Sequence, residues 1–283
     1  MVPPLFAGLV DDASVLPPSM LGVVEAVAGF RRHEQAWYHD LLGCFLMPAS
    51  IADFDPAALQ LPTTHLPICL VSDGGIGALP ATVAKLRASG AAVPQIEAAV
   101  ARRGEDPQPG LAALRRLTAD HQDLEVYAEI PMSWGLISAL DTVAEARADG
   151  QRLAPKFRVG GLAAELFPTP VELAAVICAC RDRELPFKFA AGLRHALRHT
   201  DPETGFTHHG FLNVLVAAGD AAAGGEVADV AEALAATHPL PLVEPARVRR
   251  DSPRQLWVGF GAPSVLEPLT ELIRLGLIDG GYQ

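Results

Sequence analysis

Short apolar runs alternate with amphipathic stretches along almost the whole chain, and this alternation most limits the folds open to it. Stretches with apolar residues at helical spacing separate the runs, at 80–89, 110–120, 137–149 and 170–184. Eight strands that alternate with helices predict an α/β fold, the parallel (β/α)8 TIM barrel. An open doubly wound sheet is the alternative, but no Gly-x-Gly-x-x-Gly follows the first run. The runs lie at 5–10, 44–48, 68–71, 93–98, 124–130, 156–159, 187–190 and 256–260.

Composition limits the class of protein and of partner. The 283 residues are 50% hydrophobic, which suits one barrel domain spanning residues 1–283. A formal net charge of −11 argues against a nucleic-acid partner. No apolar stretch reaches about 18 residues, and the first residues lack the basic start of a signal peptide. We therefore expect no membrane partner, a cytoplasmic location, and four cysteines that are reduced and buried.

The connection between the seventh and eighth runs is far longer than a βα unit needs. Residues 193–255 therefore form an insertion within the barrel, with helices expected at 211–218 and 226–236. Long loops often carry function, and one that starts at the barrel mouth can fold over it. The histidine spacing does not support zinc, so no metal is expected. The expected pocket-lining residues of this segment are among Arg194, His195, Arg198, His199, His208 and His209.

Two similar segments end the sixth and seventh runs. Lys156 is followed four residues later by Gly160, and Lys188 by Gly192. Parallel barrel strands deliver their last residues to the same end of the barrel, where active sites lie. A lysine beside other cations in a walled pocket loses its proton readily and attacks carbonyl groups. The pair therefore predicts imine chemistry, and the sequence leaves open which lysine forms the imine.

Charged residues end other runs as well. Residues i and i+2 of a strand share a face, so Arg158 should point the same way as Lys156. Charges inside a barrel must be paired or solvated, and Glu97 and Glu129 are the natural counter-charges. Asp12 follows the first run closely, although Asp-Asp-Ala-Ser also makes a good turn or helix cap.

An anion-binding rim is expected after the seventh and eighth runs. The backbone N–H groups of Gly192, Gly261 and Ala262 would form it, with Ser264 beside them. Pro263 has no N–H to donate, so we expect the rim to bind weakly.

Taken run by run, the chain resembles the deoxyribose-phosphate aldolases and the wider class I aldolase barrels. Residues 9–17 are similar to their Asp-His-Thr-x-Leu-x-x-Pro opening. Lys156-x-x-x-Gly160 falls on Lys-Thr-x-Thr-Gly, which carries the Schiff-base lysine, and residues 188–194 fall on Lys-x-Ala-Gly-Gly-Ile-Arg, which holds the second lysine. Residues 259–264 resemble Arg-x-Gly-x-Ser-Ser of the phosphate site. Phe157, Arg158 and Val159 depart from the pattern around the first lysine, which implies a divergent member with another substrate.

The resemblance implies a lyase that forms a lysine imine with a small oxo-substrate, phosphorylated or carboxylated, and needs no cofactor. Lys188 and Arg158 would depress the pKa of Lys156, and Glu97 would transfer protons. One alternative is a metal-assisted isomerase or hydrolase, with Glu97, Glu129 and His195 as ligands. Another is a barrel without catalysis that acts as a binding partner, and assembly into a homo-oligomer stays open.

The expected site residues fall into two sets. The catalytic set is Lys156, Lys188, Glu97 and Asp12. The set that would bind the substrate or an anion is Arg158, Glu129, Gly192, Arg194, His195, His199, Gly261, Ala262 and Ser264.

Overall fold

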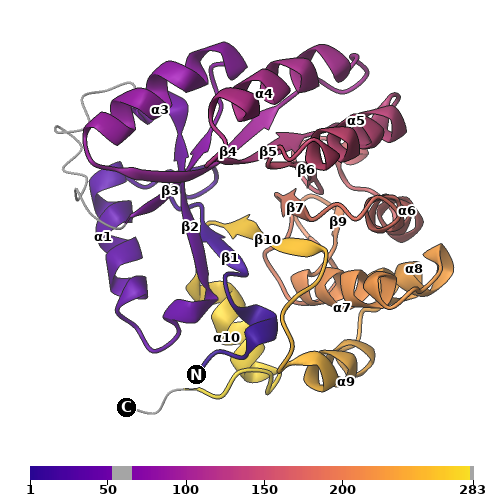
Figure 1. Cartoon of the computed structure of the whole chain (residues 1–283). Coiled ribbons are helices and arrows are strands. Elements are labelled where there is room, and N and C mark those ends of the chain that lie inside the picture. The colour runs from indigo at the N-terminus through magenta and orange to yellow at the C-terminus, as the bar shows by residue number, and fades with distance from the viewer. Residues whose placement is uncertain (53–65, 281–283) are drawn as a thin grey trace.

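The computed structural model describes residues 1–52 and 66–280, and eight parallel strands in it close into a barrel (Figure 1). Around the barrel the strands run β1-β10-β7-β6-β5-β4-β3-β2, each paired in parallel with both neighbours. This confirms the α/β fold, a (β/α)8 barrel with a long insertion after its seventh strand. The strands are β1 (Val10–Asp12), β2 (Leu42–Pro48), β3 (Pro67–Val71), β4 (Ala92–Ala99), β5 (Glu125–Glu129), β6 (Leu153–Arg158), β7 (Phe187–Ala190) and β10 (Trp257–Ala262).

Helices surround the barrel on all sides (Figure 1). The sequence marks the start of α6, which begins at Pro170: Thr169, just before the helix, and Glu172, in its first turn, form a capping box. No helix of the described ranges is long and apolar enough to cross a membrane. The helices are α1 (Val23–Glu34), α2 (Ala49–Ala52), α3 (Leu79–Ala88), α4 (Gln108–Asp120), α5 (Leu136–Ala148), α6 (Pro170–Arg181), α7 (Phe211–Ala222), α8 (Val227–Ala235), α9 (Leu240–Arg249) and α10 (Leu266–Arg274).

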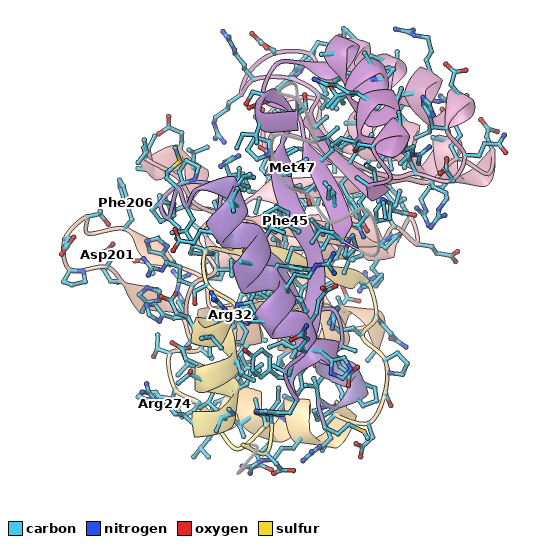
Figure 2. All side chains as sticks on the ribbon, turned by 90° about the vertical axis from the view of Figure 1, so that its left-hand side faces the viewer. Arg32, Phe45, Met47, Asp201, Phe206 and Arg274 are labelled. Atoms are coloured by element: carbon cyan, nitrogen blue, oxygen red, sulfur yellow. The ribbon has the colours of Figure 1, made fainter. Side chains whose placement is uncertain are left out.

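The two faces of the barrel wall differ sharply in chemistry. Outward-facing residues such as Phe45 and Met47 of β2 are fully buried, and the Phe45 ring contacts Phe30 of α1. Figure 2 shows Phe45 and Met47 one after the other along β2. Inside the barrel, Cys44, Leu46 and Cys69 form a small separate apolar cluster on the β2 and β3 side. The other side of the interior holds the buried charged residues Asp11, Glu97, Lys156 and Lys188, which is unusual because barrel interiors are normally packed with branched apolar residues.

The insertion between β7 and β10 folds into a hairpin followed by three helices. The hairpin strands β8 (His199–Thr200) and β9 (Thr207–His208) pair antiparallel. Figure 2 shows Asp201 and Phe206, at the hairpin tip, projecting away from the body of the molecule. Helices α7 and α8 fall where the periodicity predicts them, whereas α9 has no counterpart in the sequence-based prediction.

The first apolar run is only partly a strand. Residues Pro4–Phe6 form a 3-10 helix, and the strand begins at Val10. Pro4 has no N–H for a strand ladder and suits the first position of a helical turn. Leu5 and Phe6 are therefore buried by the turn rather than by the sheet.

All four cysteines are free and buried, as the sequence analysis expects. Burial raises the pKa of the Cys44 thiol to about 12, so that this thiol stays protonated at neutral pH.

Candidate functional site

Lys156 and Lys188 lie side by side inside the barrel and share one carboxylate. They are directly paired in register between β6 and β7. The Nζ atom of Lys156 donates to Oε2 of Glu97 at 2.6 Å, and that of Lys188 donates to Oε1 of the same carboxylate at 3.0 Å. Glu97 therefore bridges the two amines from β4, as the sequence-based assignment of counter-charges predicts.

Lys188 is enclosed by partners on every side. Its Nζ also donates to Oδ2 of Asp11 at 2.5 Å and to Oε1 of Gln95 at 3.2 Å. It lies 4.7 Å from the centre of the Tyr127 ring, in cation–π range. The other oxygen of Asp11 accepts the backbone N–H of Cys44 at 2.7 Å. Lys188 is thus fixed at the floor of the site, with no free direction for its amine.

Lys156 has a more open environment. A second carboxylate, Glu129, lies 3.1 Å from its Nζ, and the same Glu129 pairs with Arg158 at 3.0 Å. Arg158 is about half exposed, whereas Glu97 and Lys156 are almost fully buried. A row of alternating charges therefore leads from the floor of the barrel through Lys156 and Glu129 to the surface.

Glycines make room for this arrangement. A Cβ atom on Gly160 would lie 2.7 Å from the Cα of Gly192, and Gly192 has a positive φ of +75°. The glycine of each Lys-x-x-x-Gly segment thus exists because the chain beyond β6 abuts the chain beyond β7. A Cβ on Gly43 would overlap the Asp11 carboxylate, so this glycine leaves space for the partner of Lys188.

The electrostatics of the network oppose the expected lowering of the lysine pKa. Burial pulls the pKa of Lys156 down, but the Glu97 and Glu129 carboxylates outweigh burial and hold it above its usual 10.5. The pKa of Lys188 is raised further, because Asp11 and Glu97 outweigh burial in the same way. Burial raises the pKa of Glu97, yet the two ammonium groups lower it to about 2.

The expectation that Lys188 and Arg158 depress the pKa of Lys156 is therefore wrong for the resting protein. The Glu97 and Glu129 carboxylates lie within 3.1 Å of the Lys156 amine and outweigh the two cations. At neutral pH both amines are ammonium groups, and Asp11, Glu97 and Glu129 match the charges of Lys156, Lys188 and Arg158.

A cavity of about 450 Å³ opens above Lys156 at the carboxyl ends of the strands. We call it the mouth cavity. Its walls include Lys156, Glu97, Glu129 and Arg158, but not Lys188. Such a size fits a small-molecule ligand. Of the two amines, the one of Lys156 faces the space that a ligand can occupy.

Asp12 does not join the lysines. Successive residues of β1 face opposite sides of the wall, and Asp11 takes the inward position. The Oδ1 atom of Asp12 accepts the backbone N–H of Ser14 at 2.9 Å, so this side chain stabilises the turn after β1. The turn interpretation of Asp-Asp-Ala-Ser therefore describes Asp12, and the lysine partner is Asp11.

The expected anion rim is only partly brought together. Gly192 and Gly261 line the mouth cavity, as does Pro263. Ala262 is buried in β10, where its carbonyl accepts the N–H of Ala13, and neither Ala262 nor Ser264 lines the cavity. Backbone N–H groups for an anion are thus fewer than the sequence predicts.

Leu193 and Arg194, at the start of the insertion, line the mouth cavity, and Arg194 is the charged one of the two. Its guanidinium pairs with Glu267 at 3.2 Å on the surface. His195 instead pairs with Glu271 at 2.7 Å, and His199 stacks on His208 with ring centres 5.2 Å apart. Neither His195, His199, His208 nor His209 lines the cavity, so the insertion does not bring its histidines to the lysines.

The metal-assisted alternative finds no ligand set among residues 1–52 and 66–280. No group of three or more histidine, cysteine, aspartate and glutamate side chains there is arranged to hold a metal ion. Glu97 and Glu129 are engaged by Lys156, and His195 lies apart from both at the surface.

Sequence reasoning missed Gln95 and Tyr127, which complete the surroundings of Lys188. A usable signal was present, because polar residues recur at i and i+2 in three consecutive apolar strands. The pairs are 95 and 97 in β4, 127 and 129 in β5, and 156 and 158 in β6. Each pair marks the inward face of its strand.

Comparison with known proteins gives no identity for this site. No protein-family model matches the chain, and no curated protein matches it. Any assignment of function therefore rests on the fold and on the geometry of the lysine network.

Proposed function

We propose that the protein is a lyase of the class I aldolase type, in which Lys156 forms an imine with a small oxo-substrate. The observation that carries this proposal is the buried network itself. Burying ion pairs rarely stabilises a fold more than apolar packing would, so two lysines and three carboxylates in a barrel interior point to chemistry. The resemblance of the Lys156 and Lys188 segments to the aldolase pattern supports the same assignment.

Lys156 is the nucleophile in this proposal because it borders the mouth cavity, whereas Lys188 lies below it. Attack needs a neutral amine, so Lys156 must first release a proton. Both Glu97 and Glu129 line the cavity, and Lys156 and Arg158 outweigh burial and lower the pKa of Glu129 too. Glu129 is the better acceptor because it pairs with one lysine, whereas Glu97 pairs with two. Glu97 holds both lysines and has a pKa of about 2, which suits positioning rather than proton transfer. A substrate that displaces water from the cavity favours the neutral amine and acid over the ion pair.

The chemical steps then balance without a cofactor. The neutral Nζ of Lys156 adds to the carbonyl carbon, and protonated Glu129 gives its proton to the hydroxyl group that leaves as water. The resulting iminium withdraws electrons while Glu129 takes the proton of a β-hydroxyl group. The carbon–carbon bond breaks to release an aldehyde and leaves an enamine on Lys156. Glu129 protonates the enamine, and water hydrolyses the imine to free the second product.

Borohydride trapping tests the proposal. The protein is incubated with a panel of aldehydes and 2-oxo acids, reduced with borohydride, and weighed intact. The expected result is an adduct equal to the carbonyl compound less one oxygen, absent from Lys156→Met and reduced in Glu129→Gln. Absence of an adduct with every compound of the panel would contradict imine chemistry.

A further inference from the structure

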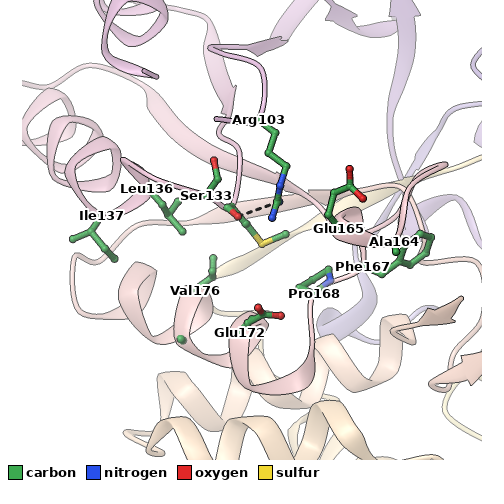
Figure 3. Close-up of a pocket in the computed structure, with 12 residues that line it drawn as sticks. Arg103, Ser133, Leu136, Ile137, Ala164, Glu165, Phe167, Pro168, Glu172 and Val176 are labelled. Atoms are coloured by element: carbon green, nitrogen blue, oxygen red, sulfur yellow. Dashed lines mark hydrogen bonds between the residues drawn. The ribbon is translucent and has the colours of Figure 1, made fainter. Parts of the chain in front are cut away.

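A groove between α5 and α6 extends the candidate site away from the barrel axis. The groove has a volume of about 510 Å³, and Figure 3 shows Leu136, Ile137 and Val176 along one side of it. Phe167 and Pro168 lie toward its other side. Apolar side chains make up most of this lining, with Arg103, Glu165 and Glu172 among them, and such a mixture is typical of pockets for organic ligands.

A third space of about 310 Å³ shares wall residues with both this groove and the mouth cavity. Glu129 and Arg158 line both the mouth cavity and this connecting space. Arg103, Met132 and Glu165 line both the connecting space and the α5–α6 groove. The three spaces therefore share walls in succession, from Lys156 to α6.

An arginine and a carboxylate line each pair of adjoining spaces: Arg158 with Glu129, and Arg103 with Glu165. Arg158 marks the first, where it pairs with Glu129. Arg103 marks the second, where its guanidinium donates to the carbonyl oxygen of Met132 at 3.2 Å (Figure 3). Glu172 lines the same groove, and its pKa is lowered chiefly by its hydrogen bonds with Thr169 and further by the charge of Arg103. The arginine therefore faces the groove and can meet a polar atom of a ligand there.

Exposed apolar side chains occur in the segments that supply the walls of the groove. Ile137 lines the groove and is about half exposed, and Trp134 and Val171, each next in the chain to a lining segment, are exposed as well. Apolar surface of this kind is where an apolar group of a ligand can bind.

We infer that the α5–α6 groove binds an apolar tail of the ligand whose reactive head lies in the mouth cavity. The inference rests on the proposed function for the chemistry of that head. It narrows the substrate class to oxo compounds that carry a hydrocarbon chain or ring distant from the carbonyl group. The wall residues shared in succession with the mouth cavity favour this occupant over a protein partner.

The test uses a homologous series of straight-chain 2-oxo acids and aldehydes, from three carbons to ten. Borohydride trapping on the full-length protein gives the concentration for half-maximal adduct at each length. Once the chain reaches the groove, each added methylene should lower this concentration about fourfold, the effect of burying one CH₂ group. Ala175 is an exposed residue of α6 that lines the groove, and Ala175→Trp should abolish the dependence for long chains only.

Ala84→Trp is the matched control, because Ala84 is an exposed alanine of α3 that lines none of the three spaces. Equal trapping of short and long chains by the wild-type protein would overturn the inference and leave the proposed function standing. So would a length dependence that Ala175→Trp leaves unchanged.

A second experiment tests the groove independently of the imine chemistry. Calorimetry compares binding of decanoate, which has no reactive carbonyl, with binding of butyrate. Decanoate binding that Ala175→Trp removes and Ala84→Trp keeps would support the groove even if no adduct forms. A wild-type dimer that Ala175→Trp dissociates, without any preference for long chains, would assign the groove to a second copy of the chain and overturn the inference.

Discussion

The lysine network inside the barrel and the histidine cluster of the insertion are both rich in titratable groups, but they are built differently. Lys156, Lys188 and Glu97 are buried and bonded to one another across β4, β6 and β7. The ring contacts of His195, His199 and His208 occur on a hairpin and its approach, where each of these residues keeps solvent contact. Density of charged residues in a sequence therefore does not locate a site, whereas the strand face on which they lie does.

Removing one member of the buried network should have the largest effect. Lys188→Met leaves Asp11 and Glu97 facing each other without the shared cation, and should lower the free energy of unfolding by about 3–5 kcal/mol. Urea unfolding followed by circular dichroism measures it. The double variant Lys188→Met with Asp11→Asn should regain part of the loss. A Lys188→Met protein as stable as the wild type would show that the network is not bonded in this way.

The second-largest effect on stability should come from acid, which protonates Glu97. Glu97 has its pKa lowered from 4.5 to about 2, so its contribution is complete above pH 4.5 and is lost as the pH falls toward 2. This contribution amounts to about 3 kcal/mol. Stability of the wild-type protein should therefore fall over that range, and that of Glu97→Gln should fall less. Parallel curves for the two proteins, from urea unfolding at successive pH values, would contradict the lowered pKa.

At alkaline pH the dependence of stability on pH has the opposite sign, because it comes from a lysine. Because the pKa of Lys156 is raised in the fold, its contribution is complete below pH 10.5 and is lost as the pH rises through the raised value. Lys156→Met should show a weaker loss of stability above pH 10.5 than the wild-type protein. The same unfolding series, continued to alkaline pH, measures the difference.

The histidine cluster should give the smallest effects. His199→Ala removes one ring from the stack with His208 and should change stability by less than about 1 kcal/mol. Adduct formation should stay within about twofold of wild type, because His199 does not line the mouth cavity. Loss of trapping in this variant would place the insertion in the site and erase the contrast between the two regions.

Much of the barrel could be predicted from the sequence, because apolar runs and helical periodicity are local signals. Helix α9 shows where they fail: it carries Pro245 inside and Pro239 at its start, and its charged and apolar residues have no regular spacing. Tertiary packing of Leu242 and Val243 holds it in place instead.

The candidate site was predictable in its composition but not in its contacts. Lys156, Lys188 and Glu97 follow from strand ends and alternation, since each is polar within an apolar run. Two adjacent aspartates cannot be told apart in this way, because the phase of β1 is set by its pairing with β10 and β2. The raised pKa of Lys156 likewise depends on the separations of 2.6 Å from Glu97 and 3.1 Å from Glu129, which no local pattern reveals.

The position of the trapped adduct tests the central claim most directly. The protein is reduced with borohydride in the presence of the carbonyl compound that labels it best, digested, and mapped by mass spectrometry. The lysine network predicts the adduct on Lys156, with Lys188 unmodified in the same sample and still unmodified in Lys156→Arg. An adduct on Lys188, or on surface residues at equal yield in Lys156→Arg, would contradict the assignment of Lys156 as the reactive amine.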